Sequence, residues 1–383
     1  MPDPEPSSGG RRLAEVAWVF LRLGATAFGG PAAHVALLEE ELVHRRRWLT
    51  REEFLDLLGA ANLIPGPNST ELAIHVGRKQ AGWAGLVAAG LGFILPATVM
   101  VGGLAWAYVR FGGLPQVEGV MRGMKPVLIA IIAQALVSLG RSAVKTKGQA
   151  LLGAVALAAC AAGANELLVL FGAGTIAMVA RGLSPERGRA SMLGFLPAAT
   201  AAPAAAAGFG LWPLFLFFLK VGSVLFGSGY VLIAFLRADL VDRWHWLTEA
   251  QLLDAVAAGQ VTPGPLFTTA TFIGYVLGGF PGAAVATVGI FLPAFVFVAV
   301  SGPLVPKLRR SKATGAFLDG VNVASLALMA LVSWQLGRAA LNGGLSVALA
   351  LAAGLVLWRF RLNSLWLLLG GAVAGWVASW VSG

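Results

Sequence analysis

The stretch LIPGPNSTE, Leu63–Glu71, interrupts one of the most hydrophobic regions of this chain, and VTPGPLFTT, Val261–Thr269, interrupts another 198 residues later. In each Pro-Gly-Pro the first proline disfavours helix in the residue before it, and the second suits the first position of a new helix. Inside a membrane, non-helical backbone is tolerated only where protein buries it or water reaches it. The two stretches therefore predict two broken helices that surround a polar cavity.

The composition is that of a polytopic membrane protein. Of the 383 residues, 57% are hydrophobic and only 12% are charged, whereas a soluble domain carries about a quarter charged residues. The net charge of +10 lies mainly in short loops between apolar segments, where basic residues set membrane orientation, so it does not predict nucleic-acid binding. No polar stretch is long enough for a separate catalytic domain, and Arg22 in the first apolar run argues against a cleaved signal peptide.

The chain repeats itself at an offset of 198 residues. Between Phe20–Pro67 and Phe218–Pro265, nineteen of forty-eight aligned positions are identical, and after a slip of one residue LPA recurs at Leu95–Ala97 and Leu292–Ala294. Such self-similarity indicates a duplicated structural unit. The predicted units are a first membrane repeat at 1–190, a linker at 191–210 and a second membrane repeat at 211–383.

Each repeat is expected to contain about five transmembrane helices and a re-entrant helix pair broken by its Pro-Gly-Pro. A helix needs about 20 residues to cross a membrane, and the flanking pieces 54–64 and 69–77 are shorter. Five spans per half give the second half the opposite orientation, so the expected fold class is an all-α polytopic membrane protein built as an inverted repeat. The predicted spans are 13–30, 83–109, 116–140, 149–163 and 165–180, followed by 211–229, 281–306, 313–340, 343–358 and 363–381.

The distribution of basic residues agrees with this scheme. Eighteen Lys and Arg residues collect on one side of the membrane and six on the other. The positive-inside rule then places the first side in the cytoplasm and both termini outside.

Each Pro-Gly-Pro is expected to lead into a helix N-terminus that binds an anion. Unpaired amide groups and the positive end of the helix dipole attract negative charge, and many secondary transporters hold an anionic group at such N-termini near the midplane. A kink without a ligand is the alternative. The candidate residues are Pro65, Gly66, Pro67, Asn68, Ser69 and Thr70 in the first half and Pro263, Gly264, Pro265, Thr268 and Thr269 in the second.

Two cations occupy equivalent positions inside apolar segments, Arg22 in the first repeat and Lys220 in the second. A cation at membrane depth costs roughly 2.5–3.5 kcal/mol even on insertion scales, so it should face a cavity or a counter-charge. Snorkelling to the interface is the alternative. We expect both side chains to contribute to anion binding.

Three further charged residues are secondary candidates. Arg122 and Lys125 lie near the start of another span, where an ion pair of Arg122 with Asp319 of the other half is an equally good explanation. Glu71 follows the first Pro-Gly-Pro where the second repeat has Thr269. A carboxylate beside an anion site is a candidate proton carrier, and capping of its own helix is the alternative.

Other polar residues are expected to be architectural. Thr50 with Glu53, and Thr248 with Gln251, fit the capping box that begins a helix. The acidic run Glu39–Glu41 has the pattern of a solvated or interfacial helix face.

Taken together, these motifs resemble the chromate ion transporter family in its long two-domain form. The resemblance implies export of chromate from the bacterial cytoplasm across the inner (plasma) membrane, driven by the proton gradient or the membrane potential, with sulfate as a structural analogue. It also implies opposite orientations for the two halves. The matching segments are FGGPAAH (Phe28–His34), RRWLTREEFLDLLGAANLIPGPNSTELA (Arg46–Ala73), GRKQAGWAGLVAAGLGFILPA (Gly77–Ala97), FGSGYVLIAFL (Phe226–Leu236), VTPGPLFTTATFIGY (Val261–Tyr275) and GIFLPAF (Gly289–Phe295). The further site residues that the resemblance implies are Phe28, Gly29, Gly30, Pro31, Gly227, Gly229 and Tyr230.

The residues alone predict a carrier of a small anion and do not separate chromate from sulfate, since both are tetrahedral dianions. A general oxyanion carrier and an anion channel are the alternative functions. An enzyme is not expected, because the sequence shows neither a nucleophile with its base nor a nucleotide-binding GxxxxGK[ST] loop. One cysteine, Cys160, and four histidines without ligand spacing predict no metal site, and no cofactor is expected. The lipid bilayer is the other expected partner, and the glycine-rich spans are compatible with a monomer or a homodimer.

Overall fold

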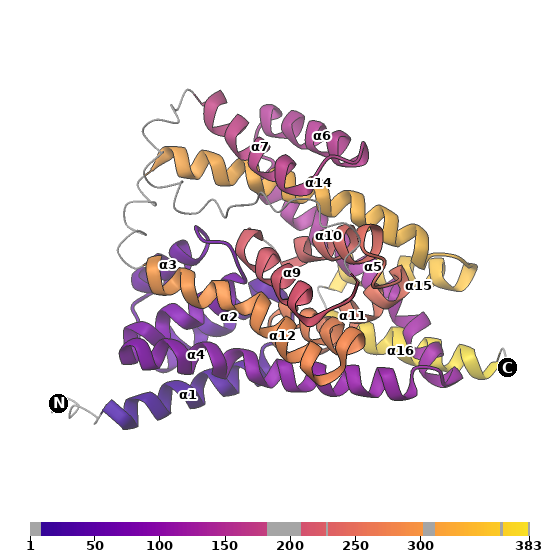
Figure 1. The fold of residues 1–383 in the computed structure, drawn as a ribbon, viewed down its shortest axis with the longest axis horizontal. Coiled ribbons are helices and arrows are strands. Elements are labelled where there is room, and N and C mark those ends of the chain that lie inside the picture. Colours follow the sequence, from indigo (N-terminus) through magenta and orange to yellow (C-terminus); the bar gives the residue numbers. More distant parts are fainter. Residues whose placement is uncertain (1–8, 182–207, 227–228, 302–310, 361–362, 382–383) are drawn as a thin grey trace.

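The computed structural model describes residues 9–181, 208–226, 229–301, 311–360 and 363–381. Every regular element in these ranges is a helix (Figure 1). Four helices are long and apolar enough to cross a membrane, so the all-α membrane class is confirmed. The elements of the first half are α1 (Gly9–Thr26), α2 (Gly30–Glu39), η1 (Glu40–Arg45), α3 (Arg51–Ala61), α4 (Asn68–Phe111), α5 (Pro115–Ala143), α6 (Lys147–Ala161) and α7 (Glu166–Ala180). Those of the second half are α9 (Leu211–Val224), η2 (Gly229–Val231), α10 (Leu232–Leu236), η3 (Arg237–Arg243), α11 (Glu249–Val261), η4 (Leu266–Thr268), α12 (Thr269–Ser301), α14 (Lys312–Ala340), α15 (Gly344–Phe360) and α16 (Ser364–Val381).

The helices fall close to the predicted spans, and their ends have local causes. The first span ends at Thr26 rather than at residue 30, because Gly29 adopts a left-handed φ of 105° that separates it from α2. Most of the predicted linker at 191–210 lies outside the described residues, so the domain boundaries stay predictions.

Both predicted capping boxes are present. The Thr50 hydroxyl accepts a hydrogen bond from the Glu53 amide at the start of α3, and the Thr248 hydroxyl accepts one from the Gln251 amide at the start of α11. Caps of this kind stabilise a helix by about 1 kcal/mol. They fix where each broken helix pair begins.

The helix after each Pro-Gly-Pro folds back on the span that follows it. Non-helical backbone at Ala81 and Gly82 divides α4 into segments 68–80 and 83–111, and α12 is divided in the same way at Gly278 and Gly279. In each half, the short segment after the Pro-Gly-Pro is therefore a separate helix, too short to cross the membrane.

Glycines allow this fold-back. A Cβ atom on Gly77 would lie 2.3 Å from the carbonyl oxygen of Gly85, and Gly274 has the same relation to the carbonyl oxygen of Gly282. The two helices of each hairpin therefore touch through their backbones.

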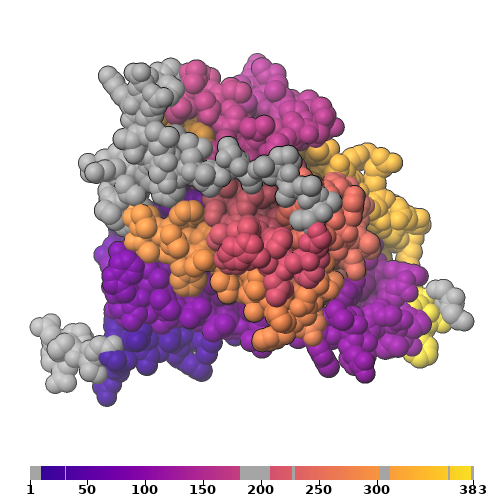
Figure 2. Space-filling model, viewed as in Figure 1, coloured from indigo at the N-terminus to yellow at the C-terminus, as the bar shows by residue number. Residues whose placement is uncertain are grey.

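The two halves exchange their packing partners. In each half the first span packs on the long helix of its own repeat, α1 on α4 and α9 on α12. The later helices cross over, because α5 packs against α15 and α16 while α14 packs against α6 and α7 (Figure 1). The surface shows the same interleaving, with α9 and α12 lying between α4 and the pair α6 and α7 (Figure 2). Neither repeat buries its apolar faces alone.

The glycine contact at the fold-back yields a stability prediction. Gly77→Ala places a methyl group against the Gly85 backbone, and overpacking of this kind costs about 1–3 kcal/mol, so we expect a lower melting temperature in detergent. Gly103→Ala, in the long segment of α4 with open space around its Cβ position, is the matched control and should leave stability unchanged or raise it. Equal melting temperatures for the two variants would show that the backbone contact at Gly77 is unimportant.

Candidate functional site

The two Pro-Gly-Pro turns are held by reciprocal hydrogen bonds between the halves. The Gly66 amide donates to the Leu225 carbonyl oxygen at 2.8 Å, and the Gly264 amide donates to the Ala27 carbonyl oxygen at 2.7 Å. Both donors and both acceptors are 198 residues apart, so the two bonds are equivalent under the repeat. Gly66 and Gly264 have φ values of 137° and 100°, which favour glycine. Each turn is thus anchored to the chain that follows the first span of the other repeat.

Each turn also packs against the repeated LPA motif of the opposite half. A Cβ atom on Gly264 would lie 2.5 Å from the Cβ of Ala97, and one on Gly66 would lie 3.7 Å from the Cβ of Ala294. The two motifs that mark the repeat in the sequence therefore meet across the interface between the halves.

The first turn opens directly into a helix N-terminus. Helix α4 begins at Asn68 after Pro67, and no side chain caps it. The Pro67 carbonyl oxygen accepts hydrogen bonds from the Thr70 and Glu71 amides, and the Ser69 hydroxyl lies 3.3 Å from Nδ1 of His34. The second proline is therefore the N-cap of the new helix rather than its first helical residue.

The second turn reaches its helix through one extra turn. Residues Leu266–Thr268 form a 3₁₀ turn before α12 begins at Thr269. The amide and the hydroxyl of Thr268 both donate to the Pro265 carbonyl oxygen. This hydroxyl is therefore engaged within its own turn, unlike the hydroxyl of Thr269.

Several buried oxygens in these first turns have no hydrogen-bond partner among the described residues. They belong to the side chains of Thr70, Glu71 and Thr269, and all three residues are fully buried. A polar group buried without a partner costs roughly 1–3 kcal/mol. Such groups are candidates for binding a ligand.

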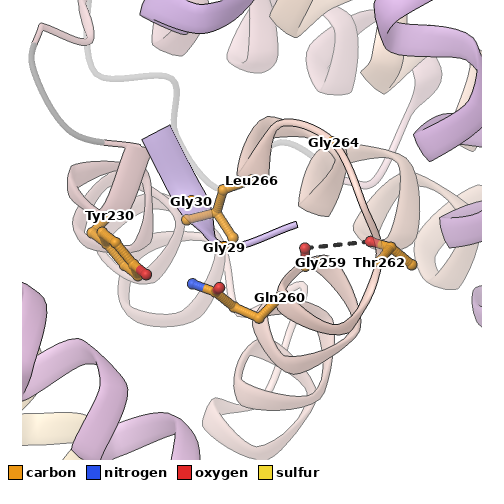
Figure 3. A pocket seen from close by; sticks show the side chains of 8 residues that line it. All are labelled: Gly29, Gly30, Tyr230, Gly259, Gln260, Thr262, Gly264 and Leu266. Carbon is orange, nitrogen blue, oxygen red and sulfur yellow. Dashed lines mark hydrogen bonds between the residues drawn. The ribbon is translucent and has the colours of Figure 1, made fainter. Parts of the chain in front are cut away.

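A small pocket joins the first half to the second turn (Figure 3). It brings together four predicted residues, Gly29, Gly30, Tyr230 and Gly264. Figure 3 shows the Tyr230 hydroxyl and the Gln260 amide pointing toward each other at its edge. Phe28 is half-buried immediately before Gly29, and the predicted Gly227 lies outside the described residues.

Gln260 and Thr262 line this pocket and were not among the predicted site residues. Gln260 precedes Pro263 by three residues, as Asn62 precedes Pro65. That shared polar position is the signal that could have identified Gln260.

The two cations at repeat-equivalent positions each lie near a buried carboxylate. Nζ of Lys220 lies 2.5 Å from Oδ2 of Asp239, and a guanidinium nitrogen of Arg22 lies 3.9 Å from Oε1 of Glu41. The side chain of Arg22 is half exposed, whereas Glu41 and Asp239 are buried. A counter-charge, one of the two predicted surroundings, is therefore present in both halves.

Further charged residues complete two clusters. The Glu41 cluster contains Glu41, Arg22, Arg45, Arg46 and Glu15. The Asp239 cluster contains Asp239, Lys220 and Arg243. Both carboxylates lie in π-helical segments, η1 and η3.

The expectation of a solvated acidic face is wrong for Glu41. Only 7% of the surface of Glu41 is exposed. Burial would raise the pKa of this carboxyl, but hydrogen bonding from Arg46 and the positive charges of Arg45, Arg46 and Arg22 lower it below the ordinary value. An acidic residue recurs at the equivalent position of the second repeat, where Asp239 follows Glu41 by 198 residues. This recurrence is the sequence pattern that could have identified Glu41.

Of the two secondary candidates, Lys125 is half-buried and Arg122 is exposed. Nζ of Lys125 lies 3.0 Å from Oδ1 of Asp254, and the Tyr108 hydroxyl donates to Oδ2 of the same carboxylate at 3.0 Å. This group joins α5, α11 and α4. Arg122 instead pairs with Glu118 on the exposed face of its own helix.

The predicted ion pair of Arg122 with Asp319 is therefore wrong. Asp319 pairs with Arg181. Arg122 instead has a partner one turn earlier on its own helix, because Glu118 precedes it by four residues.

The contrast between Lys125 and Arg122 yields a second stability prediction. Lys125→Met leaves the buried Asp254 without its cation, which costs about 3–5 kcal/mol when the carboxylate stays charged. Arg122→Gln removes an exposed pair that contributes about 0–1 kcal/mol. Thermal unfolding in detergent should show a large loss only for Lys125→Met, and restoration by the double variant Lys125→Met, Asp254→Leu would identify the unpaired charge as its cause.

Comparison of the sequence with known proteins identifies its family. The chromate transporter family profile matches residues 14–178 and 212–376. A chromate transport protein of Cupriavidus metallidurans is 34% identical over 96% of this chain and 93% of its own length, and one of Pseudomonas aeruginosa is 33% identical over 94% and 90%. A probable chromate transport protein of Synechococcus elongatus is 32% identical over 91% and 90%. No solved structure matches the chain. The chain belongs to the chromate transporter family.

Proposed function

We propose that this protein is a secondary transporter that exports chromate from the cytoplasm across the bacterial inner (plasma) membrane, driven by the proton gradient or the membrane potential. Membership of the chromate transporter family and the names of three relatives support chromate as the substrate. The observation that carries the proposal is the meeting of both Pro-Gly-Pro turns with the opposite half through Gly66 and Gly264. A transporter of this family type acts without catalysis.

The packing of α4 on α12 supports an inverted repeat. Arg78 lies beside the fold-back at which the long segment of α4 begins, and it donates to the carbonyl oxygens of Val298 and Ala299 near the end of the long segment of α12. Near the end of the long segment of α4, the ring of Tyr108 lies 5.2 Å from that of Phe272, in the short segment that folds back on the start of the long segment of α12. The two long segments thus run in opposite directions, which supports an inverted second repeat.

We place the substrate between the two turns. The uncapped N-terminus of α4 offers amide groups and a positive dipole end, with Ser69 and Thr70 in its first turn. The second half offers Thr269 and the pocket at Tyr230. Since both halves contribute to the site, rocking of one half against the other would expose it to each side of the membrane in turn.

The charged clusters would add a favourable potential. In the Glu41 cluster and in the Asp239 cluster, the cations outnumber the carboxylates by one. A surplus positive charge in a medium of low dielectric attracts an anion over several ångströms. Arg22 and Lys220 are therefore proposed to attract the dianion while their carboxylates hold them in place.

Transport in membrane vesicles tests the proposal. Everted vesicles should accumulate radiolabelled chromate when energised, and sulfate should compete only weakly. Accumulation should fall when ionophores collapse the proton gradient and the membrane potential together. Better transport of sulfate would indicate a general oxyanion carrier, and chromate equilibration that persists without energy at rates above carrier turnover would indicate a channel.

The two intramembrane cations can be tested with matched variants. We expect Arg22→Gln and Lys220→Gln to raise the KM for chromate about tenfold each, equivalent to about 1.4 kcal/mol, because each removes one surplus charge. Arg22→Lys and Lys220→Arg keep the charge and should retain a KM near that of the parent protein. A KM unchanged in both glutamine variants, with normal amounts of folded protein, would rule out a role for these cations in substrate attraction.

A further inference from the structure

Three buried titratable side chains lie beside the first Pro-Gly-Pro turn. They are His34, Glu71 and His75, with exposed fractions of 2%, 0% and 8%. The aligned positions of the second repeat hold Leu232, Thr269 and, after the one-residue slip, Phe272. The second half builds the same turn without an ionisable group at any of these positions, so the framework does not require them.

Glu71 and His75 lie on one face of the first helix of α4. They are four residues apart, so their side chains are neighbours on the helix surface. Arg78 follows on the same face and is only half-buried. Oε1 of Glu71 lies against the turn, because a Cβ atom on Gly66 would be 2.3 Å from it. This titratable stripe, formed by Glu71, His75 and Arg78, runs from the Pro-Gly-Pro turn toward the end of the short helix.

Glu71 differs from the other buried carboxylates because none of the described residues places a cation within salt-bridge distance of it. Glu41, Asp239 and Asp254 each have a Lys or Arg nitrogen within salt-bridge distance. Within the described residues, neither oxygen of Glu71 has a hydrogen-bond partner, and Nε2 of His75 and of His34 also lack one. An ionised carboxylate in this position would be costly. The resting structure therefore suits a protonated Glu71.

The described elements packed around α4 bring no compensating charge to Glu71. Helix α12 carries no Asp, Glu, Lys, Arg or His, and neither does η4. On the remaining neighbours the charged groups pair elsewhere: Arg12 of α1 with Gln80, Arg22 of α1 with Glu41, Glu15 of α1 with Arg46, Glu39 of α2 with Arg51 of α3, Glu53 of α3 with Lys79, and Glu249 and Asp254 of α11 with Arg237 and Lys125. Arg11, Glu52 and Asp56 are exposed. From α2, His34 contacts Ser69.

We propose that Glu71 must carry a proton for the anion to bind at the first turn, so that each dianion is transported together with one proton. A protonated Glu71 is neutral and can donate a hydrogen bond to an oxyanion, whereas an ionised one repels it. His75 passes the proton between Glu71 and the Arg78 end of the stripe. The complex of one dianion and one proton carries a single negative charge, so the membrane potential favours its export. The proton gradient opposes the outward movement of the proton, so this coupling selects the membrane potential as the driving force. This inference rests on the proposed function and specifies its coupling.

The test is chromate binding and proton movement with purified protein. Equilibrium binding of chromate across a pH series should show an affinity that falls about tenfold per pH unit once Glu71 ionises, as expected for one linked proton. Glu71→Gln, which is isosteric and neutral, should bind chromate with an affinity independent of pH. In proteoliposomes containing a pH-sensitive dye, the parent protein should move protons with chromate, and Glu71→Gln should move chromate without them.

Glu53→Gln is the matched control, because Glu53 is an exposed acid of the preceding helix and glutamine can keep its capping box. It should retain the pH dependence of the parent protein. A pH slope or a proton flux that survives in Glu71→Gln would overturn the inference while leaving chromate transport intact. Absence of chromate binding by the parent protein at every pH would instead overturn the proposed function. Infrared difference spectra give a second readout, since the carboxylic acid band of Glu71 should be present in the parent protein and missing from Glu71→Gln.

Discussion

The structure depends on one constraint, which is that backbone polar groups inside a membrane need partners. Two Pro-Gly-Pro turns break that rule locally, since each interrupts a helix and frees amide and carbonyl groups. The Gly66 and Gly264 amides are satisfied by carbonyl groups of the opposite repeat. An irregular segment that would be costly in a single repeat is thus stabilised only when two repeats meet, and the same requirement brings both turns to the centre of the molecule.

The exchange of helices between the halves follows from the same arrangement. Each turn is anchored in the other repeat, and the later helices of the two repeats also lie side by side. Helix α5 of the first repeat packs on α15 and α16 of the second, and α14 of the second packs on α6 and α7 of the first. Close approach uses glycine, for example where Gly123 meets the backbone of Gly371 and Gly375. Helix association in lipid gains little from the hydrophobic effect and relies on such close packing. The glycine-rich composition thereby serves the interlocking of the two repeats.

Much of this organisation could be predicted from the sequence because it is local or repeated. Span positions follow from hydrophobic length, the starts of α3 and α11 follow from capping boxes, and the turns follow from proline and glycine. The partners of charged residues could not be predicted in the same way. The π-helical turn at Glu41 rotates one member of an acidic run into the protein, and the rotation of α5 directs Lys125 inward and Arg122 outward. The hydrophobic pattern of the sequence does not determine which of these charged side chains lies inside the protein.

The repeat also separates framework from function, because each half serves as a control for the other. Features shared by both halves, such as the turns, the LPA contacts and the buried carboxylates of the two clusters, are needed wherever the unit folds. Features of one half alone cannot be explained by folding of the unit, and the buried pair of Glu71 and His75 is such a feature. An inverted repeat with two identical halves would treat the two membrane faces alike. The asymmetric ionisable residues are therefore the ones that folding of the repeated unit does not explain.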